Sequence, residues 1–308
     1  MSNAPDPFAA IPRADFDVPG HSRGLLDVFR WHYLLRLLIR TGVTTRYRNS
    51  VLGWTWSYVR PAAQFLVFWA VMGLFLDLNR GIPNYAVYLF SGIVVINLFS
   101  EAFKNATTSI VGNAPLVRKV FLPRQLFAVS AVVVAFVHFL PQVTLLLFVC
   151  LLMGWIAHVS VLQILAIVAA IVLILLFALG LGLFFGAVNV RFRDAENIVE
   201  LLLLLATWAS PVLYHWTMVA QAARAIGMDW ITQLYLMNPI TQAVELFHFA
   251  FWYPVTDIGL STSPTIAETP LAPDLGLNTL WAFVISAVVF FIGQLVFRRL
   301  EGRFAQDL

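Results

Sequence analysis

The feature that most constrains this chain is a series of apolar runs, each near the roughly 20 residues that a helix needs to cross a membrane. Hydrophobic residues make up 60% of the 308 residues and charged residues only 11%, whereas soluble proteins are about one quarter charged. So few charges cannot cover a water-facing surface. The sequence predicts an all-α integral membrane protein with six transmembrane helices in residues 49–300, near 59–77, 85–103, 126–153, 161–188, 198–214 and 280–297.

Three of the six runs are interrupted. Pro61 lies near the start of the first run, Glu101 closes the second, and the fifth contains Glu200 and Pro211. Proline removes a backbone donor, and a charged side chain is costly within a membrane. The third, fourth and sixth runs are the clearest by length and apolar content, although the third contains Pro141.

The basic residues predict which side of the membrane each loop faces. Of the 19 Lys and Arg residues, only Arg80 and Arg224 fall in segments that six spans place outside. Basic loops are retained in the cytoplasm, so both termini are expected on the cytoplasmic side of the plasma membrane, with 215–279 outside. We expect 1–23 to be a disordered cytoplasmic tail, because it lacks the apolar core of a cleavable signal peptide, and 301–308 to be a second tail.

Residues 24–48 are predicted to form an amphipathic helix at the inner surface. Within 24–41, His32, Arg36 and Arg40 share one helical face, while leucines form much of the rest. Such a helix turns its basic face toward lipid phosphates or water. The alternative is a helix with a solvated face that packs on another part of the protein.

Short re-entrant or gate helices are expected between the last two runs. The segment WITQLYLMNPITQAVELFHFAFW, 230–252, is apolar and aromatic, with Asn238 and Pro239 in its middle. A residue before proline favours extended backbone, so the sequence predicts two short interfacial or re-entrant helices.

Several motifs for chemistry are missing. Neither of the two lysines, Lys104 and Lys119, follows a glycine as in a P-loop, so the chain cannot hold ATP by that device. No His-Glu-x-x-His or Gly-x-Ser-x-Gly motif occurs. Asp15 and Asp17 form an Asp-x-Asp pair, which keeps a membrane glycosyltransferase as an alternative, although a Pro-rich tail offers no fold to position it. We expect a non-catalytic chain without a cofactor or a metal.

The inner loop 109–127 has the pattern of a short helix between two turns. Gly112 and Asn113 mark a turn, Pro115 suits a first helical turn, and Pro123 ends the helix. The basic residues of this loop, Arg118, Lys119 and Arg124, would project into the cytoplasm. They could form a docking surface, or they could be the ordinary excess of positive charge found in cytoplasmic loops.

Two other spans carry residues of interest. Gly182 and Gly186 are spaced for close approach of two helices, so we expect packing there. His138 and Gln142 flank Pro141, where they would satisfy backbone groups freed by the proline or, alternatively, line a channel.

Five ordered motifs together resemble a known family. They are YRNSVLGWTWSYVRP (47–61), YLFSG (88–92), EAF (101–103), SIVGNAPLVRKVFLPRQ (109–125) and NVRFRD (189–194). Over about residues 25–300 the chain resembles the membrane subunit of polysaccharide-exporting ABC transporters, the exporters of O-antigen, teichoic acid and galactan.

The resemblance implies a homodimeric permease that pairs with two copies of a separate P-loop ATPase, which binds the ATP and Mg. The cargo it implies is a polyprenyl-diphosphate-linked polysaccharide, O-antigen-like or a cell-wall galactan, and no nucleic acid partner is expected. A drug or a small lipid is the alternative cargo.

The resemblance also implies roles for particular residues. Segment 215–252 would supply external gate helices. The lipid headgroup would be recognised at the cytoplasmic mouth by Arg46, Arg48, Leu52 and Gly53. Coupling to the ATPase would involve Asn113, Pro115, Leu116, Val117, Arg118, Lys119 and Arg124.

An aromatic face is the last candidate site. Tyr58, Phe65 and Trp69 are followed by Met72 at spacings that keep all four on one helical face. The three rings could stack on sugars in a glycan channel. The alternatives are interfacial anchoring, which is common for Trp and Tyr, and helix packing.

Overall fold

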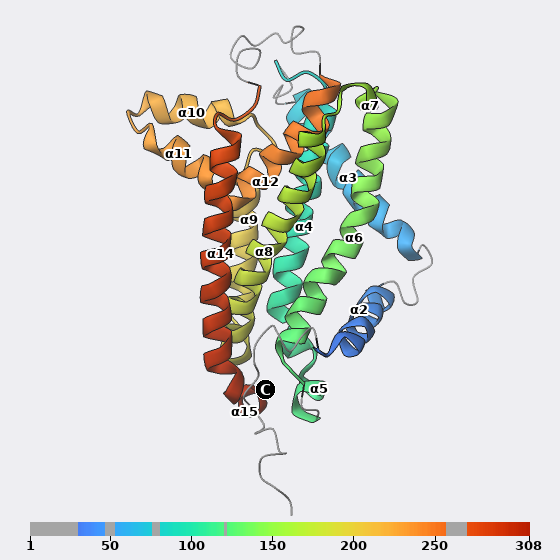
Figure 1. Cartoon of the computed structure of the whole chain (residues 1–308), viewed down its shortest axis with the longest axis vertical. Helices are drawn as coiled ribbons and strands as arrows, with labels where there is room; N and C mark the ends of the chain where they lie inside the picture. The colour runs from blue at the N-terminus through green and yellow to red at the C-terminus, as the bar shows by residue number, and fades with distance from the viewer. Residues whose placement is uncertain (1–29, 47–52, 76–80, 120–121, 257–269) are drawn as a thin grey trace, which may run out of the picture.

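The computed structural model describes residues 30–46, 53–75, 81–119, 122–256 and 270–308. Within these ranges the chain is helical and has no β-strand (Figure 1). Five helices are long and apolar enough to cross a membrane, which confirms the predicted all-α membrane fold. They are α3 (Trp56–Phe68) with the π-helical η3 (Trp69–Phe75), α4 (Tyr85–Gly112), α6 (Gln125–Leu152), α8 (Val161–Arg191) and α14 (Leu275–Leu300) with η7 (Glu301–Arg303).

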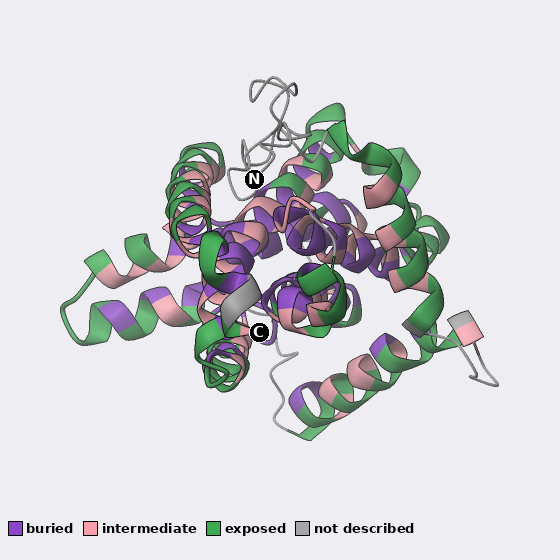
Figure 2. Ribbon diagram, turned by 90° about the horizontal axis from the view of Figure 1, so that it is seen from below, coloured by how far each residue is buried: buried purple, intermediate pink, exposed green. Residues whose placement is uncertain are grey.

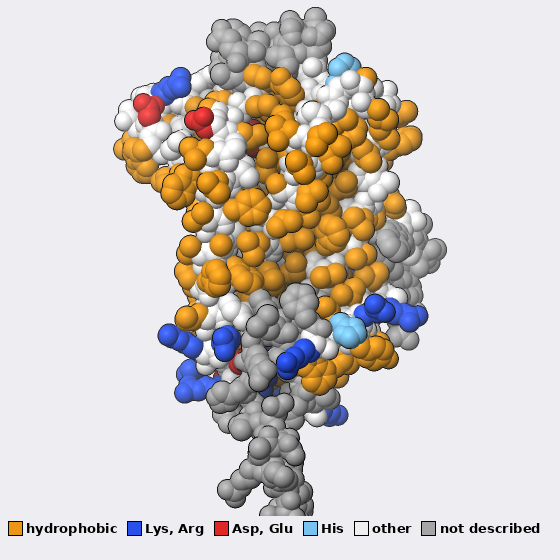
Figure 3. Space-filling view, in the orientation of Figure 1, with side chains coloured by type: hydrophobic (Ala, Val, Ile, Leu, Met, Phe, Trp, Pro, Cys, Tyr) orange, Lys and Arg blue, Asp and Glu red, His pale blue; other side chains and the backbone are white. Residues whose placement is uncertain are grey.

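Helix α4 is the centre of the bundle. In its most apolar stretch 78% of the residues are buried, against 17% to 44% in the other four long helices. Viewed along the bundle, buried residues gather in the middle and exposed residues on the rim (Figure 2). Much of that rim is apolar (Figure 3), as a surface facing lipid requires. The predicted run 85–103 is too short, because α4 continues through Glu101 to Gly112.

Small residues bring the central helices together. A Cβ added to Gly182 of α8 would collide with Cβ of Ala106 on α4, and one added to Gly186 would lie 3.2 Å from the Ala106 carbonyl oxygen. The predicted packing role of this glycine pair is therefore confirmed. A second close approach joins α8 to α14, where a Cβ on Gly180 would lie 2.7 Å from backbone atoms of Phe290.

The predicted fifth span is shorter than a membrane-spanning helix. Helix α9 (Ala195–Trp208) has 14 residues, which extend about 21 Å at 1.5 Å per residue, while the hydrocarbon core is about 30 Å thick. The helix stops before Pro211, which cannot continue its hydrogen bonding. Among the described residues, five helices rather than six reach spanning length. The chain still passes from one end of the bundle to the other between α8 and α14 (Figure 1).

The predicted short helices after α9 are present. Helices α10 (Trp216–Ala225) and α11 (Trp230–Met237) form a hairpin that projects sideways from one end of the bundle (Figure 1). The expected break follows, because Asn238 is extended and its side chain accepts a hydrogen bond from the Ile240 N–H at 3.1 Å. Helix α12 (Pro239–Phe247) and the π-helical η4 (His248–Trp252) then enter the bundle, and all nine residues of α12 are buried.

Helix α2 (His32–Arg46) combines the two arrangements expected for the N-terminal helix. Its basic face, with His32, Arg36 and Arg40, is exposed. Its other side packs on the bundle, since Leu38 contacts the core and a Cβ on Gly42 would lie 2.8 Å from a methyl group of Val134 on α6. The rest of the predicted range 24–48 lies outside the described residues.

Charge divides the molecule into two ends. Lys and Arg side chains gather at the lower end of Figure 3, where α5 and α15 lie in Figure 1. We call this the basic end; its exposed cations include Arg118, Lys119, Arg191, Arg298 and Arg299. The remaining short elements are η2 (Gly53–Thr55), α5 (Ala114–Lys119), α7 (Trp155–His158), η5 (Tyr253–Val255) and α15 (Phe304–Asp307).

Candidate functional site

A cavity of about 1050 Å³ lies in the half of the bundle nearer to the basic end. Helices α2, α3, α4 and α6 line most of it, and Leu116 of α5 and Leu203 of α9 also contribute. Most of its polar groups are uncharged amides and hydroxyls, on Ser57, Gln64, Asn97, Ser100, Asn105, Thr108, Ser130 and Gln142. Such groups form hydrogen bonds in either direction, so the cavity suits a ligand that carries many hydroxyls.

The polar wall of the cavity comes mainly from one face of α4. Asn97, Glu101, Lys104 and Thr108 follow one another at spacings of four, three and four residues, and all four line the cavity. Residues at these spacings lie on the same side of a helix. The spacing is present in the sequence, but it extends past Glu101, which closes the predicted run 85–103.

Two hydrogen bonds join this face of α4 to α6. The imidazole Nδ1 of His138 lies 2.5 Å from a carboxylate oxygen of Glu101, and the amide of Asn97 donates to Gln142 at 3.2 Å. His138 and Gln142 both line the cavity. Both residues therefore line a cavity, as the channel-lining alternative requires, and the expected backbone role is represented by a 3.4 Å contact from the Gln142 amide to the His138 carbonyl.

Helix α3 presents a different face to the cavity from the one predicted. Its lining residues include Ser57, Arg60 and Gln64, which lie one turn apart. The predicted aromatic residues are elsewhere. Tyr58 and Trp69 are exposed, and Phe65 packs edge-on against Phe90 of α4, with ring centroids 5.3 Å apart. Met72 is buried, because η3 is π-helical and shifts the helical register. Contact of Tyr58, Phe65 or Trp69 with a glycan stays a prediction.

The predicted headgroup residues lie mostly outside the described residues. Arg48 and Leu52 are outside them, as is the side chain of Arg46, whose backbone ends α2. Gly53 begins η2 with a φ of +48°, a conformation that favours glycine. Beyond η2, α3 brings Trp56 to the cavity. The headgroup role of these four residues stays a prediction.

The predicted short helix of the inner loop is α5, at the basic end of the molecule (Figure 1). The Asn113 amide donates to the Ser109 carbonyl at 2.7 Å, and the Asn113 carbonyl accepts from Leu116 at 2.9 Å. Val117 is buried against the core. One side of α5 is thus anchored, and its exposed residues are Pro115, Leu116, Arg118 and Lys119.

Arg124 differs from the other two basic residues of this loop. Its guanidinium lies 5.7 Å from the ring centroid of Phe304, and the side chain is half-buried. Burial lowers the pKa of Arg124, and the nearby carboxylate of Glu301 opposes that shift. Arg124 therefore joins the inner loop to the C-terminal turn, whereas Arg118 and Lys119 project freely, as predicted.

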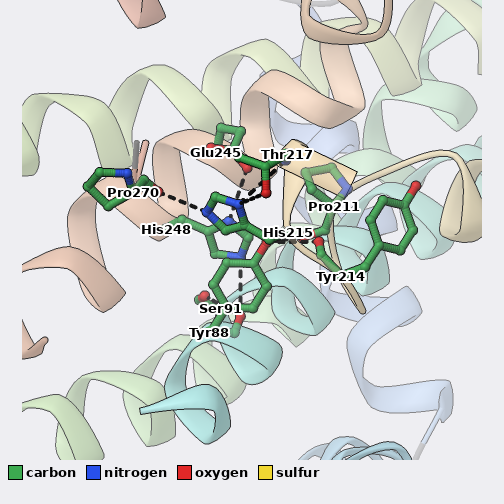
Figure 4. Close-up of polar contacts among 9 residues, drawn as sticks. All are labelled: Tyr88, Ser91, Pro211, Tyr214, His215, Thr217, Glu245, His248 and Pro270. Atoms are coloured by element: carbon green, nitrogen blue, oxygen red, sulfur yellow. Dashed lines mark hydrogen bonds and ion pairs between the residues drawn. The ribbon is translucent and has the colours of Figure 1, made fainter. Parts of the chain in front are cut away.

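A second polar cluster lies in the other half of the bundle, between α4, α12, η4 and the turn after α9 (Figure 4). The Tyr88 hydroxyl lies 3.1 Å from the Pro211 carbonyl and 2.9 Å from that of Tyr214. His248 stacks on the Tyr88 ring with centroids 3.8 Å apart, and its Nε2 donates to the Tyr88 carbonyl at 3.2 Å. His248 Nδ1 faces a carboxyl oxygen of Glu245 at 3.4 Å.

His215 fixes the start of α10 in the same cluster. Its Nε2 lies 3.1 Å from the Pro270 carbonyl, and because a carbonyl only accepts, Nε2 carries the proton. Nδ1 then accepts from the Thr217 N–H and hydroxyl, at 3.4 and 2.9 Å. Burial lowers the pKa of His215, which favours this neutral form. No spacing in the sequence indicated this cluster, since Tyr88 lies more than 100 residues before Pro211 and the other members come from separate segments further along the chain.

Comparison with known proteins adds to this geometry. The ABC-2 type transporter family matches residues 33–252. An O-antigen export system permease protein RfbA of Klebsiella pneumoniae is 27% identical over 275 residues, 89% of this chain and 95% of the relative. One of Myxococcus xanthus is 27% identical over 231 residues, 73% of this chain and 83% of the relative. The polysialic acid transport protein KpsM of Escherichia coli is 22% identical over 260 residues, 84% of this chain and 90% of the relative.

Proposed function

This chain belongs to the ABC-2 type transporter family, and on that premise we propose that it is the permease subunit of a polysaccharide exporter. The proposed cargo is a polyprenyl-diphosphate-linked polysaccharide, O-antigen-like or a cell-wall galactan. Relatives named as O-antigen export permeases and as a polysialic acid transport protein support the cargo class.

The observation that carries the proposal is the composition of the cavity wall. The wall combines apolar side chains, such as Leu37 and Val134, with a polar face on α4 that carries Asn97, Asn105 and Thr108 and is extended by Gln64 of α3. These groups exchange hydrogen bonds with hydroxyls without a fixed register, which suits a polymer that must slide past them.

The charge distribution supports an orientation. Exposed Lys and Arg residues gather at the basic end, and the cavity lies in the half of the bundle next to it (Figure 3). Positive loops are retained in the cytoplasm. The proposed exporter therefore takes its cargo from the cytoplasmic side, with the α10–α11 hairpin and the Tyr88 cluster toward the outside.

Energy for transport would enter through α5. The anchored Val117 and the exposed Leu116, Arg118 and Lys119 give α5 one side fixed to the bundle and one side available for docking. We assign the docking partner as an ATPase subunit that binds ATP and Mg. In the proposed assembly two copies of that subunit serve a homodimer of this chain.

Depletion of this chain in its own cell tests the proposal. We expect lipid-linked glycan to accumulate on the cytoplasmic leaflet, because synthesis continues while export stops. Unchanged glycan levels together with increased drug sensitivity would contradict the polysaccharide cargo and favour a drug or a small lipid. Replacing Asp15 and Asp17 by Ala should leave export intact; loss of glycan synthesis in that variant would favour the glycosyltransferase alternative.

A further inference from the structure

The cavity wall contains few charged side chains, and its cations are not all paired with acids on the wall. Glu101 and His138 face each other across the wall and form one polar pair. Two cations remain, Arg60 on α3 and Lys104 on α4, and both line the cavity. Arg60 contacts the ring of Trp56 at 5.9 Å and forms no ion pair with another described residue.

Lys104 does have a counterion, but that counterion lies outside the cavity. The ammonium is 2.7 Å from a carboxylate oxygen of Glu200 on α9, and Glu200 is not among the residues that line the cavity. The cavity is therefore lined by two cations, Arg60 and Lys104, and one carboxylate, Glu101, while the second carboxylate, Glu200, approaches Lys104 from the neighbouring helix. Cations outnumber acids on the wall itself, and such a site attracts anions.

The place of Lys104 on α4 makes its charge informative. Lys104 is eight residues from the basic end of α4 at Gly112, about 12 Å along the helix axis. It belongs to a helix long and apolar enough to cross a membrane, and charged residues within such helices generally face a water-filled path and serve transport. Its side chain is 53% exposed, so helix packing gives no reason to keep a lysine at this position.

The ion pair between Lys104 and Glu200 can be replaced by a pair between Lys104 and an anionic ligand. The two side chains are 53% and 59% exposed, and an exposed ion pair contributes little to stability. A phosphate offers Lys104 a more highly charged partner with several acceptor oxygens. Arg60, whose planar group pairs well with phosphate oxygens, approaches the same cavity from α3.

We propose that Arg60 and Lys104 form a binding site for the phosphates of the cargo inside the cavity, in which the cargo displaces Glu200 from Lys104. The ligand class is a diphosphate ester, and the inference rests on the proposed function. The site is separate from the headgroup residues predicted at the cytoplasmic mouth, Arg46 and Arg48. It would hold the charged link between lipid and glycan after the cargo has left the mouth.

The full-length chain in lipid nanodiscs with its ATPase partner provides the test. Binding of undecaprenyl diphosphate, of uncharged undecaprenol and of inorganic diphosphate is measured by competition, with phosphatidylglycerol as a fourth probe. Lys104→Gln and Arg60→Gln should each weaken binding of undecaprenyl diphosphate about tenfold, the loss expected for one charge-assisted contact. Neither should change binding of undecaprenol, and Lys104→Arg should retain binding.

Glu200→Gln separates the proposed site from a merely structural ion pair. If Glu200 competes with the cargo, this variant should bind undecaprenyl diphosphate more tightly, by about threefold, because exposed pairs are weak. If the pair only supports the fold, Glu200→Gln and Lys104→Gln should both weaken binding, and that result would overturn the inference. Arg298→Gln, an exposed cation of α14 away from the cavity, is the matched control and should leave binding unchanged.

The probes distinguish failure of this inference from failure of the proposed function. A wild-type protein that prefers undecaprenyl diphosphate, with unchanged affinity in Lys104→Gln and Arg60→Gln, would contradict only the site. A wild-type protein that binds undecaprenol equally well would contradict the diphosphate-linked cargo and the site with it. Equal binding of phosphatidylglycerol would also overturn the inference, since the site would then take any lipid phosphate. Inorganic diphosphate, which lacks the lipid, should bind only weakly, and this result supports the inference.

Discussion

The imidazole of His248 lies flat on the phenol ring of Tyr88, with ring centroids 3.8 Å apart, and both side chains are buried. The contact joins η4, which re-enters the bundle, to the central helix α4. The hydroxyl of the same tyrosine holds the turn after α9 through two backbone carbonyls. One side chain therefore connects three segments in the half of the molecule away from the basic end.

We expect Tyr88→Phe to lower the free energy of unfolding by about 1–2 kcal/mol, because the carbonyls of Pro211 and Tyr214 lose the one hydroxyl proton that they share while the ring stack remains. Thermal unfolding in detergent measures the change. Tyr58→Phe removes an exposed hydroxyl from α3 and should have no effect. Equal stability of Tyr88→Phe and the wild type would show that the hydroxyl does not hold this turn.

The sequence predicted the long helices well, because each apolar run is a local property. It did not predict the polar face of α4, since Glu101 contacts His138, which lies 37 residues further along the chain. The sequence also did not indicate where the helix of the fifth run would end, because the segment is apolar on both sides of Pro211. Nor did the sequence indicate that Met72 would be buried while Tyr58 and Trp69 are exposed, since π-helical turns from Trp69 onward break the 3.6-residue period.

Helix packing between α4 and α8 gives a second prediction. Gly182→Ala should destabilise the protein by about 1–3 kcal/mol, since its new methyl group would overlap Cβ of Ala106. The double variant Gly182→Ala with Ala106→Gly should recover most of the loss in thermal unfolding.

Gly276 provides the control for this prediction. It lies in α14 with nothing within 4 Å of an added Cβ, so Gly276→Ala should be neutral or slightly stabilising. A Gly182→Ala variant as stable as Gly276→Ala would contradict the close approach of the two helices.

The pair of Glu101 and His138 gives a third prediction. Each Ala substitution alone should lower the free energy of unfolding by about 3 kcal/mol, because the remaining partner loses its counterpart inside the bundle. The double substitution should cost less than the sum, with a coupling of about 1–3 kcal/mol in a double-mutant cycle. The substitutions His138→Ala and Arg298→Ala, at two residues that do not contact each other, should have additive effects on the free energy of unfolding. Additive behaviour of the Glu101 and His138 substitutions would contradict the pairing across the cavity.

Coupling through α5 gives a fourth prediction. Arg118→Glu and Lys119→Glu should weaken co-purification of the ATPase subunit about tenfold or more, since charge reversal at a docking surface turns attraction into repulsion. Both side chains are exposed, so the variants should fold normally. Arg224→Glu on α10, a reversal at the opposite end of the bundle, is the matched control and should leave the complex intact. Unchanged co-purification and unchanged ATP hydrolysis in the α5 variants would place the docking surface elsewhere.

Reconstitution in vesicles tests the central claim most directly. Permease and ATPase are inserted with the ATPase facing outward, lipid-linked glycan is present in the outer leaflet, and an impermeant glycosidase reports which glycan remains accessible. We predict that glycan becomes protected only when both subunits and ATP are present. Protection without the ATPase subunit, or ATP hydrolysis by this chain alone, would contradict a permease whose transport is driven by a partner.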